Sequence, residues 1–353
     1  MSTRQIKYLE AIREATDQAM ARDKSVYIIG LGVPDPRGIF GTTAGLQQKY
    51  GPQRVMDMPL SENAMTGMAI GSALVGMRPI ITHQRVDFAL LAMEQMVNQA
   101  AKWHYMFGGK HKVPLVVRLM IGRGWGQGPQ HSQSLQAWFA HVTGLKVVMP
   151  TTAHDAKGLL AASIEDDNPV IFLEHRWLHG VAGNVPEEYF TVPIGKARVM
   201  REGKDVTIVA TSYMALEALH AVDELSSEGI SAEVVDLRSI RPWDKKAVLA
   251  SVRKTGRLVV ADTAWKMFGV SGEIVATVTE EAFKSLKAAP ERVASPDYPS
   301  PTSTVLADHF YPRAGDIALA AKRTLGKPAT TKLLDRAPGQ KLDVPDPSFA
   351  GPF

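Results

Sequence analysis

Short apolar runs alternate with helix-length segments along most of this chain, and this alternation constrains its fold more than any other feature. The apolar runs of the first half predict strands at 26–30, 78–84, 113–120, 145–150 and 168–175. Between these strands, helical periodicity predicts helices at 63–75, 87–107, 134–142 and 152–165. Strands separated by helices are joined by right-handed crossovers, so the sequence predicts an α/β fold with a largely parallel sheet.

A second α/β unit follows a proline-containing junction at 184–205. It has predicted strands at 206–212, 231–237 and 257–262, and predicted helices at 213–227, 243–255, 271–285 and 314–325. The segment 294–304, rich in proline and serine, is expected to be an irregular loop. We therefore expect a first domain over 1–190 that opens with an amphipathic helix, a smaller domain over 191–326, and an extended or disordered proline-rich tail over 327–353.

Composition narrows the classes of function. Lys and Arg number 40 against 36 Asp and Glu, which gives a net charge of +4 with no long basic run, so we expect no nucleic-acid partner. The chain has no cysteine, which excludes disulfides, thiolate catalysis and cysteine-ligated metals. No apolar run approaches the roughly 20 residues that span a bilayer, and the start lacks the apolar core of a signal peptide. We expect a soluble, cytoplasmic protein without a membrane partner.

A glycine-rich run, GRGWGQGPQHSQ at 122–133, lies between a predicted strand and a predicted helix. The dinucleotide-binding motif needs glycine at its first, third and sixth positions. Counted from Gly122 the sixth position here is Gln127, and counted from Gly124 it is Pro129, so the run does not fit the motif. The run also contains no lysine followed by serine or threonine, as a phosphate-binding loop would require. Ligands bind beyond the carboxyl ends of strands in open α/β sheets, so the loop and its His131 are candidates for an active-site mouth. A solvated loop histidine is the alternative.

A second stretch, MPLSENAMTGMAIGSALVG at 58–76, begins like a helix. Ser61 is a plausible N-cap, and Glu62 then lies in the first turn, where a carboxylate complements the helix dipole. The small residues that follow favour close helix packing. The pair His175 and His179, in HRWLH, lacks the glutamate of a zinc-protease helix, so we expect no metal site there.

Taken together and in order, several motifs resemble one family. These are PLSEN, HQRVDFALLAMEQMVNQAAK, GQGPQHSQSLQAWFAHVTGLKVVMPTTAHDAKGLL, EDDNPVIFLEH and DLRSIRPWD. The family is the β chain of the thiamine-diphosphate-dependent decarboxylase component of 2-oxo acid dehydrogenase complexes, and the resemblance runs from about residue 4 to about residue 326. It implies a pyrimidine-binding domain of transketolase type followed by a smaller transketolase C-terminal domain.

The resemblance also implies a partner. In that family the β chain supplies the pyrimidine half of the thiamine diphosphate site, and a separate α chain supplies the diphosphate half through a GDG…N motif that holds Mg²⁺. The present sequence contains no GDG. We therefore expect an α2β2 heterotetramer that passes an acyl group to a lipoyl-bearing acyltransferase.

Site residues follow position by position from the resemblance. Glu62 matches the glutamate that hydrogen-bonds the N1′ nitrogen of the aminopyrimidine ring and so prepares the ring's exocyclic nitrogen to take a proton from the thiazolium carbon. Phe88 matches an aromatic residue that packs on that ring, and Leu60 and Gln84 match pocket positions. His131 matches the HSQ histidine, which orients the substrate or helps acyl transfer.

Some members of the family also hold a potassium ion. The matching positions here are Val113, Leu115, Val116, Ser163, Asp166 and Asn168. Arg85 departs from the family, which often has an aromatic or small apolar residue there, and contact with the partner chain or with a substrate carboxylate both remain open. The motifs favour a 2-oxo acid dehydrogenase, with pyruvate as the first substrate to expect. They leave acetoin cleavage, carboligation and a non-catalytic scaffold chain as alternatives.

Overall fold

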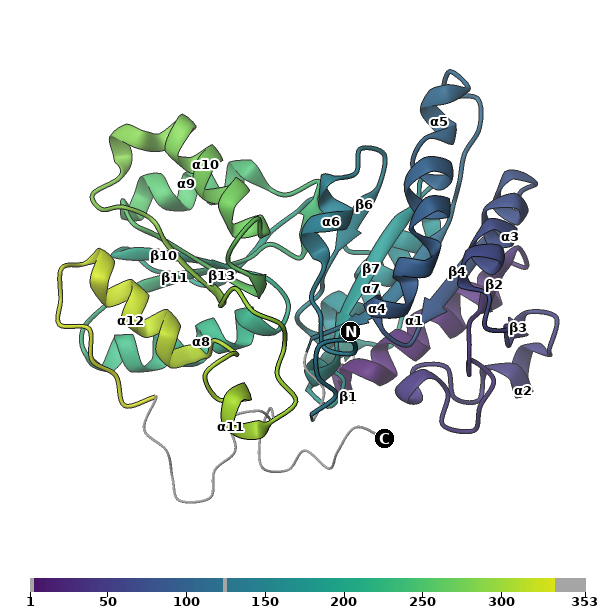
Figure 1. The fold of residues 1–353 in the computed structure, drawn as a ribbon, viewed down its shortest axis with the longest axis horizontal. Coiled ribbons are helices and arrows are strands. Elements are labelled where there is room, and N and C mark those ends of the chain that lie inside the picture. The colour runs from purple at the N-terminus through teal and green to yellow at the C-terminus, as the bar shows by residue number, and fades with distance from the viewer. Residues whose placement is uncertain (1–2, 123–125, 334–353) are drawn as a thin grey trace. The chain divides into compact units, whose positions relative to one another are not determined.

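The computed structural model describes residues 3–122 and 126–333. The chain divides into two compact units, coloured along the sequence in Figure 1. The first unit comprises the described residues up to 121 together with 138–194. The second comprises those of 122–137 and those from 195 onward. The sequence places 122–137 in the first domain by chain order, whereas the contacts of the structure group this loop with the second unit.

The first unit is built on a parallel sheet whose strands lie in the order β6-β7-β5-β4-β2-β3. Their bounds are β2 (Val26–Ile29), β3 (Val55–Met56), β4 (Arg78–His83), β5 (Val116–Ile121), β6 (Lys146–Val148) and β7 (Val170–His175). The strands β2, β5 and β7 are buried along their whole length, and β4 and β6 along all but their first residue, which is why continuous apolar runs predicted them. The two-residue β3 was not predicted.

The amino terminus corrects one prediction. The sequence predicts a helix from the start, but the chain first forms the strand β1 (Thr3–Lys7), which pairs antiparallel with β8 (Ala182–Pro186). The helix α1 (Tyr8–Arg22) begins only afterwards, and Glu10 accepts a hydrogen bond from the backbone N–H of Lys7 at 2.7 Å. A pairing across about 180 residues leaves no local signature in the sequence.

The remaining helices of the first unit alternate with its strands. They are η1 (Ile39–Gly41), α2 (Leu46–Tyr50), α3 (Glu62–Leu74), α4 (Val86–Ala89), η2 (Leu90–Ala92), η3 (Gln95–Ala100), α5 (Trp103–Met106), α6 (Gln136–His141), which starts in the second unit, α7 (Ala153–Glu165) and η4 (Arg176–Leu178). The single helix predicted over 87–107 is therefore a succession of short helices that includes the π-helix η3. Periodicity detects the helical region but not such irregularities.

The second unit is a sheet covered by helices on both faces (Figure 1). Its strands lie in the order β14-β13-β10-β11-β9 and are parallel except for β9. They are β9 (Arg198–Arg201), β10 (Val206–Ala210), β11 (Ala232–Asp236), β13 (Leu258–Trp265) and β14 (Glu291–Ser295), and a short strand β12 spans Ser239–Arg241. The helices are α8 (Tyr213–Ser227), α9 (Lys245–Thr255), α10 (Val270–Ala282), η5 (Phe283–Ser285), α11 (Thr304–Ala307) and α12 (Ala314–Thr324).

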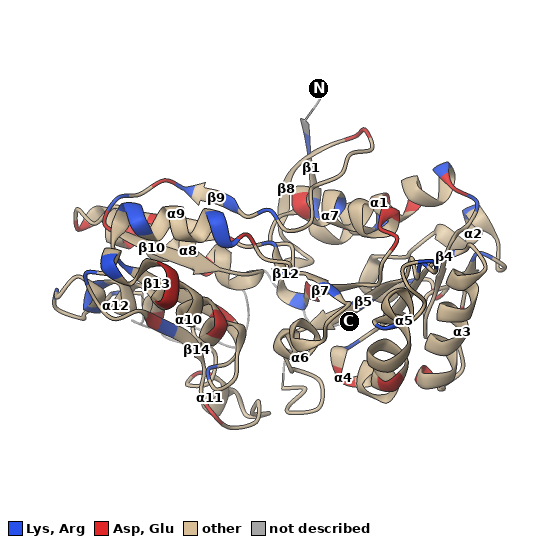
Figure 2. Cartoon of the chain, turned by 90° about the horizontal axis from the view of Figure 1, so that it is seen from above, with Lys and Arg blue, Asp and Glu red and all other residues tan. Residues whose placement is uncertain are grey.

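Alternation along β10 builds the two cores of this unit. Val206 and Ile208 face α8 and α12, whereas Val209 faces α9 and α10. Lys and Arg are interspersed with Asp and Glu over these helices, in agreement with the small net charge (Figure 2). The predicted loop 294–304 begins inside β14 and ends at α11. Of the predicted tail, 327–333 has no helix or strand, and 334–353 lies outside the described residues.

An ion pair lies in the core of the first unit. Arg118 on β5 donates to Glu174 on β7 through Nε at 2.7 Å and Nη2 at 3.0 Å, and both side chains are fully buried. His179 Nε2 lies 3.3 Å from the same carboxylate. Burial opposes ionisation of Glu174, but Arg118 and His179 outweigh it and lower the pKa of Glu174 below its ordinary value. The carboxylate is therefore charged inside the protein.

We expect acid to weaken the first unit through His83, the last residue of β4. Burial lowers the pKa of His83 from 6.5 to about 4. The unfolded chain binds a proton below pH 6.5 that the folded chain accepts only near pH 4, so stability is lost as the pH falls through this window. The loss is about 3 kcal/mol. Urea unfolding from pH 7 to pH 4 should show that the wild type loses about this much more stability than His83→Asn; equal losses would show that His83 is not held neutral by burial. Burial also lowers the pKa of His179, so the variant should retain part of the acid sensitivity.

Candidate cofactor-binding and active site

The carboxyl edge of the first unit's sheet carries most of the predicted site residues. β2, β4 and β7 end at Ile29, His83 and His175, and their carboxyl ends meet at one edge because the strands are parallel. Gln84 and Arg85 follow β4 directly, and Phe88 lies on α4, one turn further. This edge is where open α/β sheets bind ligands.

Glu62 is the first residue of α3, as the sequence predicts, and Ser61 is its N-cap residue, although the Ser61 side chain makes no capping bond. The Glu62 side chain is 8% exposed. It forms no hydrogen bond or ion pair with any of the residues that the structure describes. A nearly buried carboxyl group with its hydrogen-bonding capacity unused fits a ligand that offers a ring nitrogen, as the aminopyrimidine of thiamine diphosphate does.

The other predicted pocket residues of this unit are placed as follows. Gln84 is partly buried and its Nε2 donates to the carbonyl of Leu31 at 3.2 Å, which ties the end of β4 to the segment after β2. Phe88 is partly buried, and its N–H bonds the carbonyl of Arg85 at 3.2 Å. Leu60 is 77% exposed. An exposed leucine beside a buried carboxyl group leaves apolar surface that a ligand or a partner chain can cover.

His131 lies in the loop that belongs to the second unit. The loop closes through the N–H of Gly122, which donates to the carbonyl of Gln133 at 3.1 Å. Gly128 lies so close to Thr302 that a Cβ there would be 2.5 Å from the threonine Oγ1. His131 itself is partly buried, and its N–H reaches the carbonyl of Gly128 at 3.4 Å. Of the predicted site residues, His131 therefore belongs to a different unit from Glu62, Gln84 and Phe88.

A buried amide–carboxyl contact anchors the end of this loop. Gln136 donates through Nε2 to Asp262 at 2.5 Å and to Thr263 at 3.2 Å. Burial raises the pKa of Asp262, although the N–H of Ala264 and the Gln136 amide act in the opposite direction. Sequence reasoning gave Gln136 and Asp262 no role, because they lie 126 residues apart and no local pattern connects them.

Some of the residues predicted to bind potassium lie on neighbouring segments. Val113 and Leu115 lie beside residues 167–170. The N–H of Val113 donates to the carbonyl of Asp167 at 3.1 Å, and the N–H of Val170 donates to the carbonyl of Leu115 at 2.8 Å. However, the Asp166 carboxylate already pairs with Lys146 and with Asn168. These contacts do not indicate that a further cation binds there. The potassium site therefore remains a prediction that rests on the resemblance alone.

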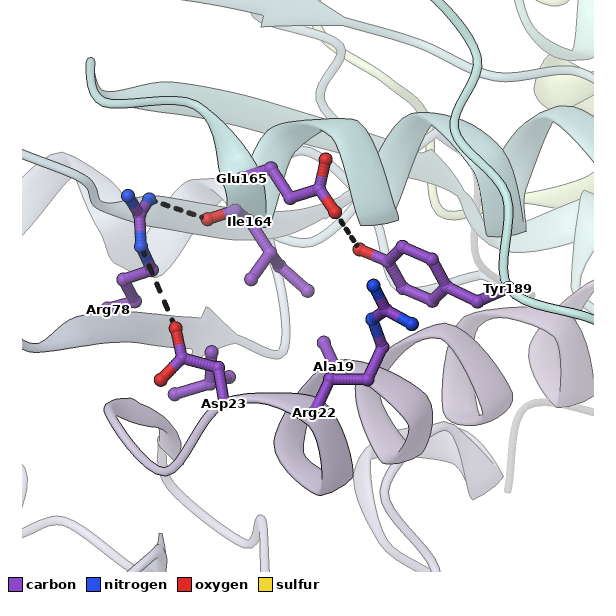
Figure 3. Close-up of a pocket in the computed structure, with 8 residues that line it drawn as sticks. Ala19, Arg22, Asp23, Arg78, Ile164, Glu165 and Tyr189 are labelled. Carbon is purple, nitrogen blue, oxygen red and sulfur yellow. Dashed lines mark hydrogen bonds and ion pairs between the residues drawn. The ribbon is translucent and has the colours of Figure 1, made fainter.

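A cavity of about 240 Å³ lies beside these residues, at the opposite edge of the sheet (Figure 3). It is lined by Ala19, Arg22, Asp23, Val26, Arg78, Ile164, Glu165 and Tyr189. Arg78 donates to the carbonyl of Ile164 at 3.0 Å and Tyr189 to Glu165 at 2.7 Å, so its polar groups bond mainly one another. We assign this cavity no catalytic role.

Two residues that sequence reasoning passed over, Arg176 and Phe40, also lie at the carboxyl edge. Arg176 follows β7 and is 8% exposed. Phe40 lies with its ring centre 4.5 Å from the Arg176 Cζ and 6.1 Å from the ring centre of His179. No local pattern could have indicated these contacts, because they join segments about 135 residues apart.

Family models match both parts of the chain. Residues 4–180 match the transketolase pyrimidine binding domain, and residues 195–317 match the transketolase C-terminal domain. A solved structure described as a split gene transketolase, inactive beta4 tetramer, aligns with a TM-score of 0.76 at 24% identity, over 91% of this chain and 99% of that one. The fold and these matches define the class: a transketolase-type, two-domain α/β protein.

Relatives with curated names narrow the class. The chain is 46% identical to the pyruvate dehydrogenase E1 component subunit beta-2 of Oryza sativa, over 89% of this chain and 85% of that protein. It is also 46% identical to the acetoin:2,6-dichlorophenolindophenol oxidoreductase subunit beta of Cupriavidus necator, over 89% and 96%. The pyruvate dehydrogenase E1 β subunit of Rattus norvegicus is 42% identical over 91% of both chains. This chain belongs to the family of thiamine-diphosphate-dependent dehydrogenase β subunits that includes these pyruvate and acetoin enzymes.

None of the helices within the described residues combines the length and the apolar character needed to cross a membrane.

Proposed function

We propose that this chain is the β subunit of a thiamine-diphosphate-dependent 2-oxo acid dehydrogenase, with pyruvate as the first candidate substrate. The enzyme would decarboxylate the 2-oxo acid oxidatively and pass the acyl group to a lipoyl domain of an acyltransferase. The observation that carries the proposal is Glu62, a nearly buried carboxyl group without a bonding partner in the described part of the chain, at the helix start that the family's motif occupies.

Thiamine diphosphate, when bound, supplies the nucleophilic carbon and the electron sink for decarboxylation. The residues of this chain would hold the pyrimidine ring of the cofactor and tune its reactivity. Glu62 would share a proton with the N1′ nitrogen of the pyrimidine, and Phe88 would pack on that ring. Gln84, held by its bond to the carbonyl of Leu31, would line the pocket.

The surface of α3 supports an α-chain partner. Its exposed residues Ala64, Met68 and Gly71 continue a stripe from Leu60 to Val75, at positions that recur on one helix face. Met68 is 64% and Val75 82% exposed, and α3 carries no charge after Glu62, so its ribbon is tan there in Figure 2. An apolar helix face that leads away from Glu62 is suited to burial by another subunit. We infer an α2β2 assembly in which the α chain holds Mg²⁺ and the diphosphate.

The test is 2-oxo acid-dependent dye reduction by this chain co-purified with its natural α partner. Thiamine diphosphate and Mg²⁺ are supplied, and pyruvate, 2-oxobutyrate, branched 2-oxo acids and acetoin are compared. Activity with a 2-oxo acid that neither chain shows alone supports the proposal. Activity with acetoin alone would assign the chain to the other branch of its family, which the Cupriavidus relative represents. A bound partner without activity on any substrate would contradict both and favour carboligation or a scaffold role. A cytoplasmic location remains a prediction, to be checked by cell fractionation.

Replacing His131 with alanine should impair the transfer of the acyl group more than the binding of the cofactor. We expect the rate with the lipoyl domain as acceptor to fall about 10- to 100-fold, because a positioned proton donor or acceptor contributes at least this much. The thiamine diphosphate concentration for half-activation should change little. His141→Ala, at the end of α6, is the control. Unchanged transfer in His131→Ala would remove His131 from the mechanism.

A further inference from the structure

The loop that carries His131 is held by the second unit at two places, one on each side of the histidine. On the amino-terminal side, Gly128 lies against Thr302, so closely that a Cβ at residue 128 would be 2.5 Å from the threonine Oγ1. On the carboxyl-terminal side, Gln136 bonds Asp262 through its side chain. His131 lies between these two attachments, so its position depends on both.

The contact between Gln136 and Asp262 is shielded from water. Gln136 is 0% and Asp262 3% exposed. The Nε2 atom of Gln136 lies 2.5 Å from Oδ1 of Asp262, and the same atom donates to the hydroxyl group of Thr263 at 3.2 Å. A buried hydrogen bond is stronger than one in water, and breaking it leaves a polar group that water cannot reach. The amide of Gln136 is therefore fixed by its partners.

Asp262 is a rigid anchor because of its place in the sheet. It lies on β13 directly after Ala261, which pairs with Ala210 of β10 on one side and with Val293 of β14 on the other. Residues 126–135, in contrast, form neither helix nor strand. The irregular loop therefore takes its position from the strand, as loops on a rigid scaffold do.

We propose that Gln136 and Asp262 are positioning residues for acyl transfer: their contact holds the loop so that His131 meets the incoming lipoyl group. This inference rests on the proposed function and deepens it. Neither residue has to touch the substrate or the cofactor in this role. Glu62 and Gln84, by contrast, belong to the first unit. The steps that depend on the pyrimidine ring should therefore not need the contact between Gln136 and Asp262.

The transfer is the step that needs a placed histidine. In the overall reaction the 2-oxo acid loses CO₂ and gives two electrons to the disulfide of an oxidised lipoyl group. The S–S bond breaks, one sulfur forms a thioester bond to the acyl carbon, and the other sulfur takes up a proton and becomes a thiol. An imidazole can supply this proton near neutral pH. A displacement of about 1 Å can lower the rate of such a step about 10²-fold.

The experiment compares two electron acceptors in the complex of this chain with its α partner. A dye takes up electrons without forming a thioester, so it reports the steps before transfer. With a lipoyl domain as acceptor, we expect kcat of Gln136→Ala and of Asp262→Ala to fall about 10- to 100-fold. Dye reduction and the KM values for the 2-oxo acid and the lipoyl domain should stay close to those of the wild type. The double variant should lose no more than the more impaired single variant, because all three lack the same contact.

Two further variants separate the contact from other effects. Asp262→Asn keeps an oxygen that accepts from the Gln136 amide, so it should retain most of the transfer rate. Thr207→Val is the matched structural control, because Thr207 is also buried in the second unit and its hydroxyl group bonds those of Ser251 at 2.7 Å and Thr255 at 2.8 Å. This variant should lower the stability of the unit without changing the ratio of the two rates.

If an alanine variant does not assemble, Gln136→Met keeps the length of the side chain without its donor and should give the same result. Assembled variants whose ratio of lipoyl to dye rates equals that of the wild type would overturn the inference. An Asp262→Asn variant as impaired as Asp262→Ala would also overturn it, since the charge and not the contact would then be needed. A wild type that transfers no acyl group from any substrate would instead overturn the proposed function, and the inference with it.

Discussion

Replacing Glu62 with glutamine in the assembled enzyme should lower kcat by about 10²- to 10⁴-fold, the range that a single acid–base group supplies. Glutamine keeps the size of the side chain and can still accept or donate a hydrogen bond, but it cannot share a proton with a ring nitrogen. The free chain should unfold at nearly the wild-type urea concentration, because Glu62 makes no bond within the described residues. The association with the α chain should also persist.

The alternative, that Glu62 only complements the dipole of α3, makes a different prediction. Glu10→Gln is a matched control, since Glu10 also lies in the first turn of a helix of the same unit and bonds the N–H of Lys7. Dye reduction and urea unfolding should show that Glu10→Gln costs a few tenths to about 1 kcal/mol of stability and no activity. If Glu62→Gln shows the same pattern, Glu62 has no role in the chemistry.

Replacing Arg118 with methionine should destabilise the first unit by about 3–5 kcal/mol, because the change leaves the buried charge of Glu174 without its main partner. Part of the loss should return in the double variant Arg118→Met, Glu174→Leu, which removes both charges and fills the space with apolar atoms. The measurement is the free energy of unfolding in urea, with Lys49→Met as the control, since Lys49 belongs to an exposed ion pair with Asp17. A loss below 1 kcal/mol, as for the control, would show that the pair is not shielded from water.

Local patterns predicted the parts of the fold that rest on local physics. The helix predicted over 213–227 is found with the same bounds in α8, and α3 and α7 begin and end within one residue of the predictions, because an apolar face repeats through each. The strands β1, β8 and β9 were missed because none of them is a continuous buried apolar run, and their pairing depends on distant residues. The sequence predicted a helical region after Arg85 but not its interruptions, because the π-turn of η3 does not change the spacing of the apolar residues.

The residues of the candidate site also fall into two groups, those that local motifs indicated and those that they did not. Glu62 and His131 could be named from motifs, because each lies within a short recognisable string of residues. The contact between Arg176 and Phe40 could not, because two segments far apart in the sequence build it. Arg85 stood out in the sequence only as a departure from the family's pattern.

The assignment of residues 122–137 to the second unit has a consequence for engineering this chain. A chimera made by joining the first part of one family member to the last part of another at residue 194 would separate the His131 loop from the surface on which it rests. Thr302 would have to suit a foreign Gly128, and Asp262 a foreign Gln136. The part of the chain that has to be exchanged is therefore discontinuous in the sequence. A successful exchange of the C-terminal unit has to include the loop, through two additional junctions near Ile121 and Trp138.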